Sequence, residues 1–195
     1  VMSNGRKSSK VKRVAYELID AESVHGARMY RMLADLVTSH HADIGTARIA
    51  LAWALAWKPD VDGRLILGKC KRASDLDREL AAYDFIILLN REFWQSLQVS
   101  DLQRTALLDH ELMHAALTLD VNGEPKEDDR GRQVYRTRRH DIEEFSAVVE
   151  RYGCYKKDLE IFARALLRSE TDDQPTWIGY QPLRDRLAAV GVDVA

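Results

Sequence analysis

The sequence predicts an α+β fold with an N-terminal helix, a short mixed sheet of about three to four strands, and C-terminal helices. Two observations lead to this prediction. Apolar residues recur every three or four positions near the start, in the middle and near the end of the chain, which is helical spacing. Between the first two of these stretches, residues 49–57 alternate large with small side chains, and 84–90 is a short apolar run; both patterns are typical of strands.

The chain begins with a basic, serine-rich tail at 1–13 that has nothing to bury, so we expect this tail to be disordered. Residues 14–195 are expected to form one domain, because a chain of 195 residues can bury a core without disulfides or a structural metal. The first predicted helix runs from Tyr16 to about Ser39, with a break near 21–23 left open as an alternative. His40 and His41 follow it. Adjacent side chains point apart, so both histidines are interpreted as solvent-facing residues at the helix end.

The strand signals lie in three segments. In 49–57 large residues face one way and alanines the other, and the alanine face would allow a helix to approach closely. A turn at 59–63 is followed by 64–70, which we interpret as the returning strand of a hairpin. The run at 84–90 is bounded by polar residues and fits a strand that is covered on both faces.

Side chains that can cap a helix precede three later helical patterns, at 74–80, 100–117 and 141–152. Such a side chain accepts a hydrogen bond from a first-turn N–H group, and an acidic or amide residue three positions later can return the bond as a capping box. The predicted pairs are Ser74 with Asp77, Ser100 with Gln103, and Asp141 with Glu144.

The remaining segments are a long connection and the C-terminal helices. Residues 118–139 are polar, with a short strand expected at 134–137. A connection of this length is more often functional than structural, for instance as a loop over a cleft. Helices are predicted at 156–168 and, after a tail with several aromatic residues, at 182–190.

The helix predicted at 100–117 carries the pattern His-Glu-x-x-His, from His110 to His114. Residues four apart lie about 40° apart around a helix, so both imidazoles can reach one metal ion. Glu111 points to the side, where it can reach a metal-bound water. The opposite side of the helix is a core-facing stripe of Leu108, Leu112, Ala115 and Leu119. A surface helix with two solvated histidines is the less favoured interpretation.

A catalytic zinc site needs a third protein ligand and an open position for water. His140, just before the helix predicted at 141–152, is the first choice. Glu143 and Glu144 are the alternatives, because a carboxylate from the following helix also completes such sites. The competing interpretation is that residues 140–144 are only the polar start of a helix and contain no metal ligand.

One catalytic Zn²⁺ would lower the pKa of its bound water, and Glu111 would take the proton as that water attacks a carbonyl. The intermediate needs a further hydrogen-bond donor. Nothing in the sequence selects among the nearby candidates Tyr135, Arg138, Arg139 and Tyr152.

Composition and charge restrict the function classes. The chain is 46% hydrophobic and 31% charged with a net charge of −2, as in soluble globular proteins, and gives no general argument for binding nucleic acid or a membrane. The basic tail leaves nucleic-acid binding as an alternative. Cys70 and Cys154 are expected to be structural thiols. No apolar run approaches the ~20 residues of a membrane helix, and no secretion signal is seen, so a cytoplasmic protein is expected.

The apolar run 85–90, the motif at 110–114 and the segment 140–145 together resemble the zincin metallopeptidases. The resemblance is to the small intracellular group that includes phage metallopeptidases and SprT-like proteins, and it covers about residues 45–153. It implies a small zincin-like domain in which His110 and His114 bind zinc and Glu111 is the general base. Leu117 stands where the extended metzincin motif would continue, and no Cys-x-x-Cys follows, so neither extension is present. In zincins the sheet edge beside the active helix often pairs with the substrate backbone; the 84–90 strand is the candidate if it lies at the edge.

Two function classes follow. The first is a zinc-dependent metallopeptidase that hydrolyses a protein or peptide substrate. The alternative is a catalytically silent, zinc-binding regulatory protein on a zincin scaffold, associated with a partner or with DNA through the tail and the charged loop at 124–139. A purely structural metal site has no use for the glutamate between the histidines, which favours the first class.

Overall fold

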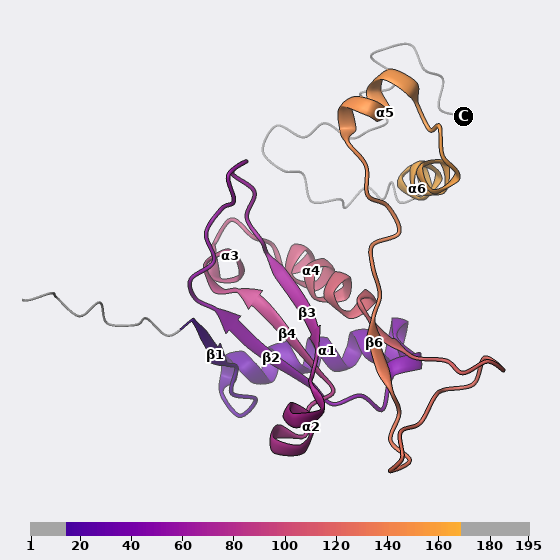
Figure 1. Cartoon of the computed structure of the whole chain (residues 1–195). Helices are drawn as coiled ribbons and strands as arrows, with labels where there is room; N and C mark the ends of the chain where they lie inside the picture. The colour runs from indigo at the N-terminus through magenta and orange to yellow at the C-terminus, as the bar shows by residue number, and fades with distance from the viewer. Residues whose placement is uncertain (1–14, 169–195) are drawn as a thin grey trace, which may run out of the picture. The chain divides into compact units, whose positions relative to one another are not determined.

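A computed structural model describes residues 15–168 of the chain. These residues divide into two compact units, with the boundary between Thr137 and Arg138. Figure 1 shows the elements. The basic tail expected at 1–13 and the helix expected at 182–190 lie outside the described residues. The expectation of a single domain over 14–195 stays a prediction.

The first unit contains a four-stranded mixed sheet, in agreement with the predicted fold class (Figure 1). Its order is β1-β2-β4-β3, in which β2 and β4 run parallel and the two outer pairs are antiparallel. The strands are β1 (Tyr16–Leu18), β2 (Ile49–Ala54), β3 (Gly68–Arg72) and β4 (Phe85–Asn90).

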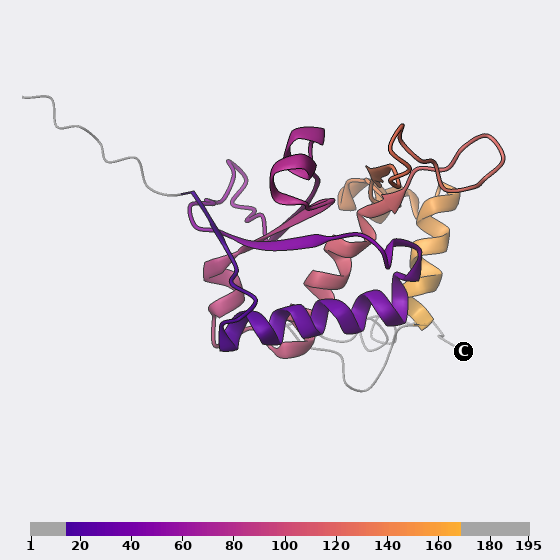
Figure 2. The same cartoon turned by 90° about the horizontal axis from the view of Figure 1, so that it is seen from below.

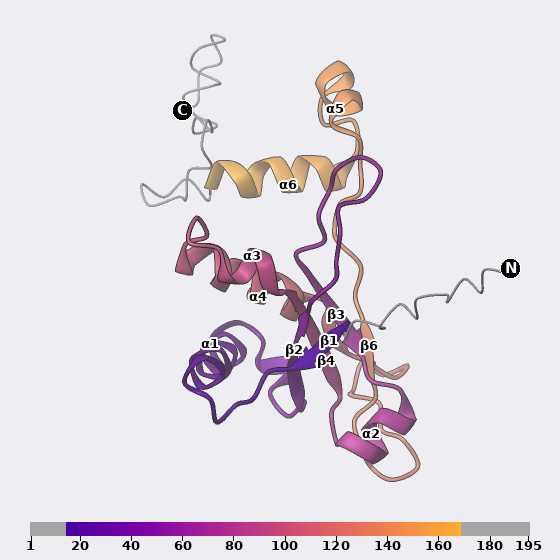
Figure 3. The ribbon, with the colours of Figure 1, turned by 90° about the vertical axis from the view of Figure 1, so that its left-hand side faces the viewer.

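Helices α1 and α4 cover one face of this sheet (Figures 2 and 3). The large side chains of β2, such as Leu51 and Trp53, point to that face and form the core with residues of both helices. The helices of the unit are α1 (Val24–His40), the short 3₁₀ helix η1 (Ala42–Ile44), α2 (Asp75–Ala81), α3 (Arg91–Gln95) and α4 (Asp101–Met113). No helix within residues 15–168 is both long and apolar enough to cross a membrane.

The helix predicted from Tyr16 to Ser39 is wrong in its first part. Residues 16–18 form β1 and pair with the end of β2, with Tyr16 opposite Ala54. The helix begins only after Ser23, whose side chain accepts a hydrogen bond from the Gly26 N–H. Strand pairing is non-local, so helical spacing in this short segment could not reveal it.

The predicted hairpin is also wrong. Residue 54 ends β2, and the following strand, β3, pairs with β4 rather than with β2. Burial agrees with this order: the 85–90 run is almost wholly buried, as suits an interior strand, whereas β3 exposes Lys69 and Lys71, as suits an edge.

The helix carrying the His-Glu-x-x-His pattern ends at Met113 rather than near Leu117. The chain then enters β5 (Ala115–Leu117), which pairs with β6 (Tyr135–Thr137) in register Ala115 to Thr137. The strand predicted at 134–137 is thereby confirmed. The polar connection between them folds back on itself through backbone hydrogen bonds, including Thr118 N–H to Val134 O at 2.8 Å. Leu119, predicted to face the core, is 56% exposed.

The described part of the second unit contains α5 (Ser146–Tyr152) and α6 (Lys157–Arg168). The helix predicted at 156–168 is confirmed. The one predicted to begin at Asp141 begins five residues later, after Phe145, and no side chain caps it. The carboxylate of Glu144 is engaged elsewhere: it pairs with Lys156 at 2.8 Å and accepts a hydrogen bond from the Tyr155 hydroxyl.

Candidate metal centre

The His-Glu-x-x-His residues lie at the C-terminal end of α4. The capping box predicted at the other end is present: the Gln103 N–H donates to the Ser100 side chain at 3.2 Å, and the Ser100 N–H donates to Gln103 at 2.8 Å. The fully buried Leu108 and Leu112 hold the back of the helix in the core. This orientation leaves His110 exposed and His114 half-buried on the outer side.

His114 is the C-cap residue of α4, but its φ of −74° and ψ of −22° are still helical. The spacing of one turn is therefore kept, and the two imidazole rings lie with their centroids 5.1 Å apart. The carbonyl end of a helix carries partial negative charge, so a cation at this end is favoured.

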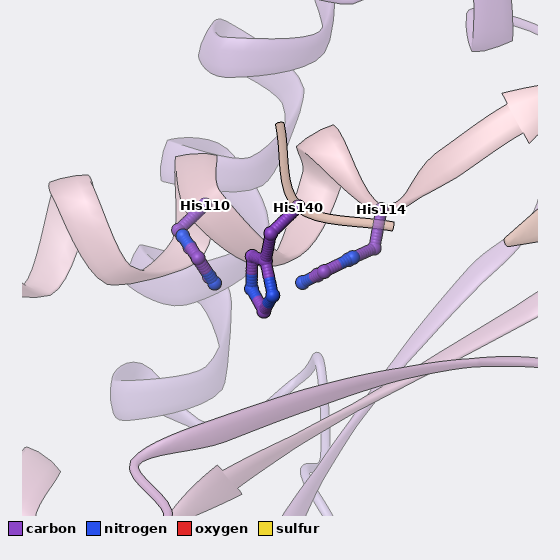
Figure 4. A group of neighbouring side chains, drawn as sticks. All are labelled: His110, His114 and His140. Atoms are coloured by element: carbon purple, nitrogen blue, oxygen red, sulfur yellow. The ribbon is translucent and has the colours of Figure 1, made fainter. Parts of the chain in front are cut away.

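His114 directly precedes β5, and His140 follows the end of β6, its antiparallel partner, by three residues. One ligand atom from each of His110, His114 and His140 can be chosen so that all lie within 4.8 Å of one another. Figure 4 shows the three side chains converging. These residues could hold a metal ion.

Glu111 points away from solvent, with 3% of its surface exposed. Burial raises the pKa of its carboxyl group, although His114 and a hydrogen bond from the Cys70 backbone N–H lower it in part. Its Oε2 atom is buried and has no hydrogen-bond partner. A buried carboxylate oxygen normally has a partner, so this atom marks a place where a further polar group belongs.

The donor set fits a transition metal such as zinc. Imidazole nitrogen is a common zinc ligand, and three protein ligands leave a fourth position for water. The unpartnered Oε2 of Glu111 is suited to a hydrogen bond from such a water.

The alternative third ligands do not join this group. Glu143 is exposed, and Glu144 lies in its own network within the second unit. Bonds from Lys156 first, and then from Tyr155 and the Phe145 N–H, lower the pKa of Glu144 to about 2.

Among the candidate donors for the reaction intermediate, Tyr135 is 5% exposed and its hydroxyl bonds to Gln133 at 3.0 Å and to Thr46 at 3.2 Å. Tyr152 is 70% exposed on α5. Neither arrangement singles out a residue for this role.

Sequence reasoning missed a polar contact directly beside the site. His41, interpreted as solvent-facing, is 3% exposed, and its Nε2 lies 2.6 Å from an Asp109 carboxylate oxygen. Asp109 immediately precedes His110 on α4, so this contact ties the end of α1 to the helix that carries the motif. His40 is exposed as predicted. Nothing local to either histidine distinguishes the two.

A second missed feature is the buried pair of Arg78 and Asp84. Arg78 also donates to the Gln133 carbonyl at 3.1 Å, and its guanidinium lies 5.9 Å from the centroid of the Tyr135 ring. It thereby fixes the start of β6, the strand that leads to His140. A basic residue followed six positions later by an acidic residue is a common pattern, so the sequence did not indicate that Arg78 and Asp84 form a buried ion pair.

Comparison with protein families agrees with the motif. A family model described as "Putative phage metallopeptidase" matches residues 21–167, which include α1, the sheet strands β2 to β4, and all three histidines. Searches of curated proteins and of solved structures gave no match.

Proposed function

Since this chain belongs to the family described as putative phage metallopeptidases, we propose that it is a zinc-dependent peptidase acting on a protein or peptide. In this proposal His110, His114 and His140 hold one zinc ion, and Glu111 is the general base. The observation that carries it is the convergence of three imidazoles from two separate parts of the chain, two of them on the helix turn that also carries Glu111.

Zinc bound to three histidines would supply a Lewis acid that polarises a carbonyl group and acidifies a water molecule. Glu111 then has the task of moving protons. Its unpartnered Oε2 is buried beside the two histidines of the motif and can accept a proton from water. The same atom can return the proton to the leaving amine.

The corrected topology changes the proposed place of the substrate. A peptide bound by strand addition requires a free sheet edge beside the active helix. The 84–90 strand cannot serve, because β4 lies inside the sheet between β2 and β3. The edge strand is β3, so we propose that the substrate backbone pairs there, with those outward backbone groups that Glu111 does not occupy.

The first test is metal content by elemental analysis of the wild-type chain, His110→Ala and His140→Ala, each purified without added metal. The expected result is close to one zinc per wild-type chain and loss in both variants. His40→Ala is a matched control, because His40 is an exposed histidine at the end of α1 and should not affect zinc content. No zinc in the wild type, even after reconstitution, would refute the proposal.

The second test is Glu111→Gln, assayed for hydrolysis of unfolded protein substrates. We expect this variant to retain zinc and to lose about 10²- to 10⁴-fold in kcat, the usual contribution of a general base. Zinc binding with no hydrolysis by the wild type would instead favour the silent regulatory protein.

A further inference from the structure

The backbone groups of β3 point alternately toward β4 and toward the outer edge of the sheet. The Asn90 N–H donates to the Leu67 carbonyl at 2.8 Å, and the Ala73 N–H donates to the Asp84 carbonyl at 2.9 Å. In an antiparallel ladder the bonded positions alternate, so odd-numbered residues of this strand bond to β4. The N–H and C=O groups of Gly68, Cys70 and Arg72 therefore face away from β4, toward the outer edge of the sheet.

One of these outward groups forms a hydrogen bond with Glu111. The Cys70 N–H donates to the Glu111 carboxylate, in agreement with the direction that the ladder gives it. The edge of the sheet thus supplies a hydrogen bond to this carboxylate, whose Oε2 atom has no partner.

Gly68, two residues earlier on the same side, leaves the space in which that side chain lies. A Cβ atom at position 68 would be 2.4 Å from Glu111 Oε1 and 2.8 Å from both its Cδ and Cγ atoms. Carbon atoms do not approach so closely, so an alanine there requires Glu111 or β3 to move. The backbone of Gly68 does not have the positive φ that favours glycine. Glycine at this position is therefore explained by the space that Glu111 occupies.

We propose that β3 is a positioning element for Glu111, in which Gly68 provides the space for the carboxylate and the Cys70 N–H orients it. The catalytic consequence rests on the proposed function, whereas the contact itself does not. A general base must lie within hydrogen-bond reach of its proton, and a misplacement of about 1 Å can cost 10²-fold in rate.

The contact is tested by thermal unfolding of four full-length proteins: wild type, Gly68→Ala, Glu111→Ala and the double variant. In the wild-type background we expect Gly68→Ala to lower Tm by about 3–8 °C because of overpacking. In the Glu111→Ala background the three nearest clashing atoms are gone, so the same change should not lower Tm. An equal fall in both backgrounds would overturn the proposal. Should Gly68→Ala fail to fold, a double variant that folds like Glu111→Ala supports the proposal, and one that also fails overturns it.

The positioning role is tested by kinetics with zinc content measured in parallel. Gly68→Ala should retain zinc and KM while kcat falls about 10²-fold. It should add little to Glu111→Gln, because both changes remove the same function. Lys69→Ala is the matched control, since Lys69 is exposed and points to the opposite face of β3. Wild-type kcat in Gly68→Ala would overturn the role. Absence of hydrolysis in the wild type would refute the proposed function instead, and the unfolding experiment would still decide on the contact.

Discussion

The substitution Arg78→Met should destabilise the first unit by about 2–4 kcal/mol. Arg78 and Asp84 have side chains only 7% and 4% exposed, with nitrogen–oxygen distances of 2.9 and 2.8 Å. Removing one partner of a buried pair costs about 3–5 kcal/mol. The cost is reduced here because Asp84 keeps two hydrogen bonds from Arg48, through its backbone N–H and Nε. Methionine replaces much of the aliphatic stem, so the loss reports the charge rather than packing.

Urea unfolding followed by circular dichroism measures this loss directly, and the matching fall in Tm is roughly 5–12 °C. The control is Arg72→Met, because Arg72 pairs with Asp75 at 3.8 Å on the surface and should contribute less than about 1 kcal/mol. A loss below about 1 kcal/mol for Arg78→Met would refute the assignment of this pair as an anchor of β6.

The pH dependence gives an independent check. Burial raises the pKa of Asp84, but hydrogen bonds from Arg48 and the charges of Arg48 and Arg78 outweigh burial, so the pKa lies below 3.8. A carboxyl whose pKa is lowered by folding stabilises the fold above its unfolded pKa, and this stabilisation is lost as pH falls through the folded value. The difference between wild type and Arg78→Met should therefore be constant at neutral pH and shrink below about pH 3.8. A difference that grew toward acid would contradict the argument.

Three further predictions concern α4 and the metal. Ser100→Ala removes the N-cap and should lower the free energy of unfolding by about 1 kcal/mol in urea titrations; an unchanged midpoint would show that the cap does not contribute. Glu144→Gln should leave zinc content unchanged, because Lys156 and Tyr155 already engage that carboxylate; zinc loss would make Glu144 the third ligand. Zinc at 100 times its Kd should stabilise the wild type by about 2.7 kcal/mol relative to chelator-treated protein, and calorimetry of His110→Ala should show no such difference.

Local features of the fold could be predicted from the sequence. The capping boxes at Ser74 and Ser100 are both present, because the two halves of each box are three residues apart and need no other part of the chain. The pair at 110 and 114 is likewise set by helix geometry alone. The box predicted at Asp141 failed for a non-local reason: Lys156 and Tyr155 bind Glu144 more than ten residues away.

The strand pairings could not be predicted in the same way. Nothing within 64–72 shows whether that strand pairs with β2 or with β4, since hydrophobic pattern gives the faces of a strand but not its neighbours. The burial of His41 depends on Asp109, 68 positions later, and is equally invisible to local reasoning. The residues around the helix end are as compatible with a solvent-facing histidine as with a buried histidine that contacts a distant carboxylate.

The parallel pairing of β2 and β4 explains how β3 comes to form the edge of the sheet beside α4. Parallel neighbours cannot be joined by a tight turn, so the chain between Ala54 and Phe85 must leave the sheet and return. The strand formed within that crossover can add to the outer side of β4, where its even-numbered backbone groups remain free of the sheet. Gly68 and the Cys70 N–H are then available to Glu111, which a hairpin between β2 and β3 would have placed elsewhere. The predicted hairpin placed this strand beside β2, so the sequence alone could not show that Gly68 and Cys70 contact the proposed general base.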